Sequence, residues 1–115
     1  MDAELEKEWQ IVLKQIRAQF GEDLDLQGIL FLIGVQELGK GNKNFTKQEK
    51  TELLHVAVCS LLEEYGYYIY EGKDADGWPH WRSTEKLPSL KPMEQERLIK
   101  QAVVLYFQKN LTFDN

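Results

Sequence analysis

The segment from Leu26 to Leu38 most constrains how this chain can fold, because it is apolar nearly all round. It could be a buried helix or a buried strand, since hydrophobic periodicity alone does not separate the two. Its length, its leucine content and the glycine that follows at Gly39 favour a helix. A helix without a polar face must be covered on several sides. We therefore expect it to lie at the centre of the fold, with Gly28 and Gly34 allowing close approach of its neighbours.

Three further helices are predicted from apolar spacing and from capping signals. The first ends near Gly21, and its apolar face consists of Leu5, Trp9, Val12, Leu13, Ile16 and Phe20. Thr46 and Glu49 form a capping box, so another helix begins at Lys47 and runs to about Tyr65. The expected core stripe of that helix is Leu54, Val58, Leu61 and Tyr65. Pro92 suits the first turn of a last helix.

Size and charge narrow the classes of function. The 115 residues are predicted to form a single domain, 1–115, because two cores would have fewer than about 60 residues each. The net charge of −5 argues against nucleic acid or an anionic membrane as partner. The N-terminus does not resemble a signal peptide, and the longest apolar run, Ile29 to Ile33, is too short to span a membrane. A cytoplasmic location is therefore expected, and the lone Cys59 agrees with a reducing compartment.

Residues 67–82 have the pattern of strands. Tyr67-Tyr68-Ile69-Tyr70 is a β-prone run, and Asp76-Gly77 is a turn signal. We expect a short β-hairpin or an extended flap before the last helix. Pro79 cannot donate a ladder hydrogen bond, so its arm should be an edge or irregular.

The same region concentrates the aromatic residues of the chain. Six of the 13 lie between residues 65 and 81, a stretch that we call the aromatic segment. Together they carry more apolar surface than a soluble monomer exposes, so the helices or a partner must cover most of them. A rim of aromatic rings with polar groups is the best binding-site candidate in the chain. The candidate residues are Tyr68, Tyr70, Asp76, Trp78, His80, Trp81 and Arg82.

A metal site is the alternative. Glu52 and His55 have the Glu-x-x-His spacing of metal-binding helices, and Glu37 could add a carboxylate. A di-metal site needs two such pairs and the chain has one, so we expect neither a bound metal nor another cofactor. The alternative function is thus a metal-dependent enzyme that uses His55 or His80 with nearby carboxylates. Cys59 lies mid-helix among apolar residues, where burial raises the pKa of a thiol and makes it inert.

Two motifs only approximate known sites. Residues 34–41 match a phosphate-binding loop except at the last position, which is Gly41 instead of Ser or Thr. Residues 74–85 have acids at the first, third and twelfth positions of a calcium loop, but Pro79 replaces the glycine that its sharp turn requires. We interpret the first as a helix end and the second as a hairpin turn.

Two stretches of the sequence, Leu26 to Gly39 and Asp74 to Trp81, together resemble small uncharacterised bacterial proteins of mainly helical fold. The resemblance implies that fold, and it implies no activity, cofactor or catalytic residue. We therefore predict a mainly α protein, a compact bundle of about four principal helices around the central helix. The leading functional hypothesis is a cytoplasmic binding or interaction module that uses the aromatic segment, with a homo-oligomer or a protein as partner.

Overall fold

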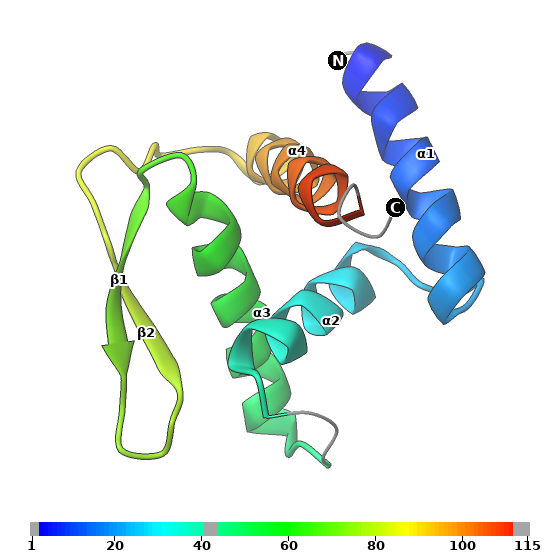
Figure 1. Ribbon diagram of the computed structural model, residues 1–115. Coiled ribbons are helices and arrows are strands. Elements are labelled where there is room, and N and C mark those ends of the chain that lie inside the picture. Colours follow the sequence, from blue (N-terminus) through cyan, green and yellow to red (C-terminus); the bar gives the residue numbers. More distant parts are fainter. Residues whose placement is uncertain (1–2, 41–43, 112–115) are drawn as a thin grey trace. The chain divides into compact units, whose positions relative to one another are not determined.

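The computed structural model describes residues 3–40 and 44–111, and within these ranges it contains four helices and one β-hairpin (Figure 1). In chain order the elements are α1 (Ala3–Phe20), α2 (Leu26–Leu38), α3 (Lys47–Glu63), β1 (Tyr68–Lys73), β2 (Pro79–Ser83) and α4 (Pro92–Leu111). The prediction of a mainly helical chain with a hairpin before the last helix is confirmed. Over the described ranges, no helix has both the length and the apolarity that crossing a membrane requires.

The chain divides into two compact units, with boundaries after Asp25 and after Ser89. One unit contains α1 and α4, and the other contains α2, α3 and the hairpin. The candidate residues of the aromatic segment all lie in the second unit.

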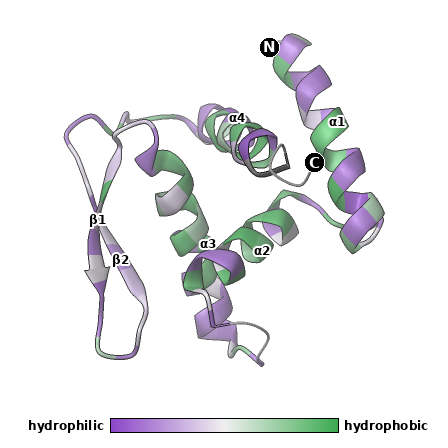
Figure 2. Cartoon of the chain, in the orientation of Figure 1, coloured by the Kyte–Doolittle hydropathy of each residue, from purple (hydrophilic) through white to green (hydrophobic). Residues whose placement is uncertain are grey.

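The apolar segment is a helix, as its length and its glycine ending predicted. Figure 2 shows apolar residues along most of α2, and Ile29, Ile33 and Leu38 are almost fully buried. At Gly34 the helix lies so close to α3 that a Cβ would overlap the backbone carbonyl of Leu53. The close approach predicted at Gly34 is therefore confirmed, and it needs a residue without a side chain.

Both ends of α3 are held by local hydrogen bonds. The Thr46 hydroxyl accepts from the Glu49 N–H at 3.1 Å, and the Thr46 N–H donates to the Glu49 carboxylate at 2.9 Å, which confirms the capping box. At the other end, the N–H of Tyr67 donates to the Leu62 carbonyl and that of Gly66 to the Glu63 carbonyl. Gly66 has a φ of +77°, so this end is a Schellman motif closed by glycine.

The predicted core stripe of α3 is wrong in detail. Only Leu61 of its four residues is buried, and the others are half-buried. The buried residues of α3 are Leu53, Val56, Ala57, Cys59, Leu61 and Leu62. The physical reason is that both α2 and the hairpin pack against α3. Two neighbours cover a wider surface of the helix than the single stripe that was assumed.

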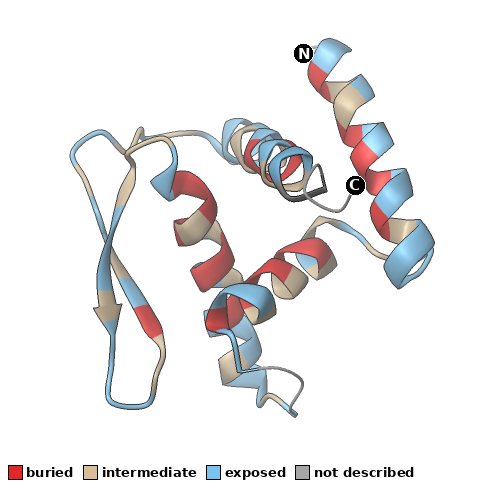
Figure 3. Ribbon diagram, viewed as in Figure 1, coloured by how far each residue is buried: buried red, intermediate tan, exposed pale blue. Residues whose placement is uncertain are grey.

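The hairpin pairs β1 antiparallel with β2, so the predicted strand pair is confirmed. Tyr70 lies opposite Trp81, and Glu71 is the extra residue of a bulge before the pairing resumes at Gly72. Figure 3 shows intermediate and exposed residues over most of the hairpin. The buried residue of β2 is its first, Pro79. A proline is tolerated at the first residue of a strand, which explains why this arm still pairs.

In the unit formed by α1 and α4, the apolar face of α1 is buried as predicted except at its last residue. Phe20 is 52% exposed, because α1 ends there and the chain turns at Gly21, whose φ is +130°. The buried side chains of α4 include Ala102, Val103 and Val104. The two helices together supply the core of this unit.

Candidate functional site

The two faces of the hairpin have different surroundings. Side chains alternate between the faces of a strand, so Pro79 and Trp81 lie on one face and His80 and Arg82 on the other. The first face is turned toward α3, because the Trp81 indole N–H donates to the Glu63 carboxylate at 2.6 Å. We call it the helix-facing side and the opposite face the outer side.

Two tyrosines of β1 lie on the helix-facing side with Trp81. The ring of Tyr70 is 5.3 Å from that of Trp81, centroid to centroid, across the strand pair. Tyr68 lies two residues before Tyr70 and so shares its face of β1, and burial, with a smaller contribution from Cys59, raises the pKa of its hydroxyl. The structure therefore brings Tyr68, Tyr70 and Trp81 together and places His80 and Arg82 on the outer side.

None of the six aromatic side chains in the aromatic segment is buried. Tyr70 is 45% exposed, and the other five are half-buried. Tyr65 and Tyr67 stack on each other with 5.7 Å between their ring centroids. On β1, Ile69 is 44% exposed. The helices thus cover only part of the apolar surface of this region.

Asp74 organises the turn between the strands. One carboxylate oxygen accepts from the backbone N–H groups of Asp76 and Trp78, at 2.9 and 3.0 Å. The other oxygen lies 2.8 Å from His80 Nε2. The hydrogen bond with His80, and then that from the Trp78 N–H, hold the pKa of Asp74 below its ordinary value. Sequence reasoning did not assign Asp74 this role. Aspartate side chains in turns nevertheless often accept a hydrogen bond from the backbone N–H two residues later in the chain.

The tip of the turn is also tied to the end of α2. The ammonium group of Lys40 donates to the backbone carbonyl of Asp76. A Cβ at Gly77 would lie 3.1 Å from the Lys40 side chain, so glycine leaves room for this contact. Nothing in the sequence pairs Lys40 with residues so far along the chain, so only the fold reveals this contact.

The candidate metal ligands are not gathered into a site. Glu37 accepts a hydrogen bond from the Ser60 hydroxyl at 2.8 Å, and His55 Nε2 lies 3.4 Å from the Cys59 sulfur. Burial raises the pKa of the Cys59 thiol to about 11, as expected, so it is protonated and unreactive at neutral pH. Among the described side chains, no three His, Cys, Asp or Glu residues lie close enough together to hold a metal ion, and Glu52 therefore has no such set to join.

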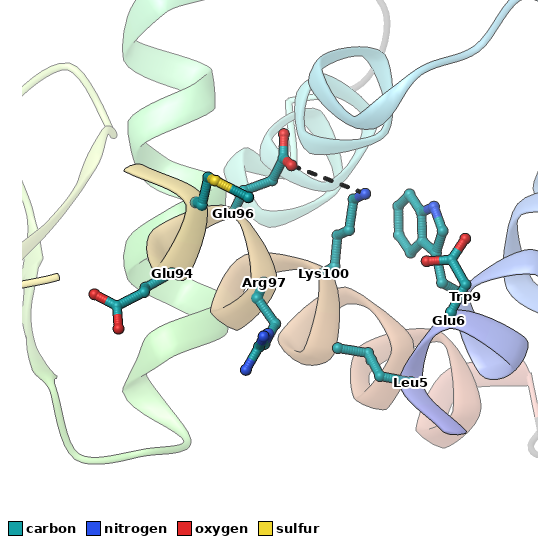
Figure 4. Close-up of a pocket in the computed structure, with 8 residues that line it drawn as sticks. Leu5, Glu6, Trp9, Glu94, Glu96, Arg97 and Lys100 are labelled. Carbon is teal, nitrogen blue, oxygen red and sulfur yellow. Dashed lines mark ion pairs between the residues drawn. The ribbon is translucent and has the colours of Figure 1, made fainter. Parts of the chain in front are cut away.

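A groove that sequence reasoning missed lies in the unit of α1 and α4 (Figure 4). Its volume is about 260 Å³, and it is lined by Leu5, Glu6, Trp9, Met93, Glu94, Glu96, Arg97 and Lys100. The Lys100 ammonium lies 5.4 Å from the centre of the Trp9 ring and 4.0 Å from the Glu96 carboxylate. The cation and the ring therefore already have partners within the chain. The signal for this groove, one lysine on α4 and one tryptophan on α1, is too sparse to find from sequence.

Comparison with known protein families, curated proteins and solved structures finds no match to this chain. The resemblance to small bacterial proteins stays a prediction.

Proposed function

We propose that this protein is a small cytoplasmic interaction module whose contact surface is the hairpin, and that it works without a cofactor. The observation that carries the proposal is the incomplete cover of the hairpin. Tyr70 on the helix-facing side and Ile69 on the outer side are both exposed, and the other rings of the aromatic segment are only half-buried. Apolar surface that the chain itself leaves exposed on both faces of the hairpin is available for a protein partner to cover.

The surroundings of these residues suit recognition. Tyrosine and tryptophan offer a large apolar surface together with a polar group, and they are enriched where interfaces gain most of their energy. The turn is held by Asp74 and by Lys40, so the hairpin is ordered before it meets a partner. Preorganisation of this kind lowers the entropy cost of binding.

The proposal includes the finer expectations for the protein. We propose that the four helices form a single bundle around α2, and that the partner is a protein, either a second copy or another chain. The outer side adds polar groups at the rim, where His80 and Arg82 are exposed. A polar rim around an apolar patch is the usual arrangement of such surfaces.

The test compares two exposed aromatic residues. Tyr70→Ala removes a ring from the hairpin, and Phe20→Ala removes a ring of similar exposure from the end of α1. We expect Tyr70→Ala to weaken binding to immobilised wild-type protein, or to a protein captured from cell extract, about tenfold or more. Phe20→Ala should bind as the wild type does. Equal binding by both variants would contradict the proposal.

A further inference from the structure

One edge of β1 faces away from β2, and backbone N–H and C=O groups on that edge have no partner strand among the described residues. The Thr84 N–H donates to the Tyr67 carbonyl at 3.0 Å, so these two residues form a hydrogen-bonded pair. Bonded and non-bonded pairs alternate along an antiparallel ladder, so the N–H and C=O groups of Tyr68 and Tyr70 point away from β2. No backbone hydrogen bond from beyond the hairpin reaches either tyrosine within the described chain.

The corresponding edge of β2, which faces away from β1, lacks one of its hydrogen-bond donors. At the turn, the Asp74 N–H donates to the Trp78 carbonyl at 2.9 Å, so the next pair, Lys73 and Pro79, is a non-bonded one. The nitrogen of Pro79 therefore points away from β1, on the free edge of β2, and it has no hydrogen to donate. Prolines of this kind prevent edge strands from pairing.

We propose that the open edge of β1 pairs antiparallel with β1 of a second copy of this chain, about a two-fold axis at Ile69. Tyr68 of each copy would exchange both backbone hydrogen bonds with Tyr70 of the other. This inference rests on the proposed function, and it names the partner and the mode of binding.

The strand is self-complementary in this register, which favours a second copy. Tyr68 and Tyr70, whose backbone groups point away from β2, lie one on each side of Ile69. A two-fold axis at Ile69 therefore forms the hydrogen-bonded pair of Tyr68 with Tyr70 twice. The exposed side chain of Ile69 meets its own counterpart, and Glu71 faces Tyr67 of the other copy, so no like charges are opposed. The bulge at Glu71 limits the pairing to a few residues. The dimer should therefore be reversible, and the two-fold symmetry uses up the β1 edge of both copies, while Pro79 disfavours further pairing on the β2 edge.

Opposite charges at the two-fold axis test this register. In sedimentation velocity over a concentration series, we expect reversible dimers for the wild type. Ile69→Lys and Ile69→Glu alone should each self-associate about tenfold more weakly or worse, because like charges then face each other. An equimolar mixture of the two variants should restore the dimer. Ile11→Lys, at a similarly exposed isoleucine on α1, should dimerise as the wild type does.

Amide exchange of the wild type tests the same pairing without any variant. Protection of the Tyr68 and Tyr70 amides should rise with protein concentration, while that of the Ile69 amide, already bonded to β2, should not change. A wild type that stays monomeric, variants that dimerise normally, or exchange independent of concentration would each overturn the dimer. If the self-pairing fails but the wild type binds another protein that Tyr70→Ala no longer binds, the proposed interaction module stands and only the dimer is contradicted.

Discussion

α2 and the hairpin are both rich in apolar residues and both pack against α3, yet they are buried to very different extents. In α2, Ile29, Ile33 and Leu38 are almost fully buried. In β1 and β2, whose residues the structure describes completely, Pro79 is the one buried residue. A two-stranded ribbon has two faces, and one helix can cover only one of them. The apolar content of an element therefore determines how much apolar surface must be buried. The shape of the element, a helix or a two-stranded ribbon, determines how much of that surface its neighbours in the chain can bury.

The largest effect is expected from charges placed in the two regions. Leu30→Asp puts an unpaired carboxylate at a buried position of α2 and should cost about 4 kcal/mol or more of unfolding free energy, enough to prevent folding. Ile69→Asp, at an exposed position of β1, should cost less than about 1 kcal/mol. Urea unfolding followed by circular dichroism measures both. Similar losses would break the comparison, because the hairpin would then be part of the core.

A smaller loss is expected where α2 meets α3. Gly34→Ala should destabilise the protein by about 1–3 kcal/mol, because the added Cβ overlaps the Leu53 backbone. The effect should appear although alanine is favoured over glycine in a helix by about 1 kcal/mol. Gln36→Ala, at an exposed position of the same helix, should change stability by no more than about 0.5 kcal/mol. A Gly34→Ala variant as stable as the wild type would show that the helices can separate without cost.

The turn of the hairpin should respond to acid. The folded-state pKa of Asp74 is lowered from 3.8 by His80 and by the Trp78 N–H, so its ionised form stabilises the fold. That contribution is present at pH values above 3.8 and is lost as the pH falls through the folded-state pKa. Melting temperatures of the wild type and of Asp74→Asn should therefore differ at pH 7 and converge in acid. Asp76→Asn, in the same turn, is the matched control, and an equal difference at every pH would refute this role for Asp74.

The smallest effect is expected at the tip of the turn. Lys40→Met removes the hydrogen bond to the Asp76 carbonyl, and because Lys40 is exposed the loss of stability should be below about 1 kcal/mol. The amides of the turn should nevertheless exchange faster, while those of α2 keep their protection. Lys47→Met, at the start of α3, is the control, because it removes an exposed lysine of the same unit. Unchanged exchange at Gly77 and Trp78 would show that the turn holds its shape without Lys40.

Local signals predicted the elements of this fold. The Thr46–Glu49 capping box and the glycine after α2 marked helix ends because capping depends on a few adjacent residues. The core stripe of α3 was not predictable, because it depends on which elements cover the helix. For the candidate site, the sequence identified the aromatic residues of the hairpin but not the role of Asp74. The Asp74–His80 contact depends on strand register, and that is set by turn geometry rather than by composition.

The central claim is that the hairpin is the surface through which this protein contacts others. A photo-reactive benzoyl-phenylalanine placed at Tyr70 tests it most directly, with the same residue placed at Phe20 as a control of similar exposure. After irradiation of cells that express each version, we expect cross-linked adducts at position 70 well above those at position 20. Mass spectrometry of the adducts then identifies a second copy or another protein. Absence of adducts at position 70, or equal yields at both positions, would contradict the account.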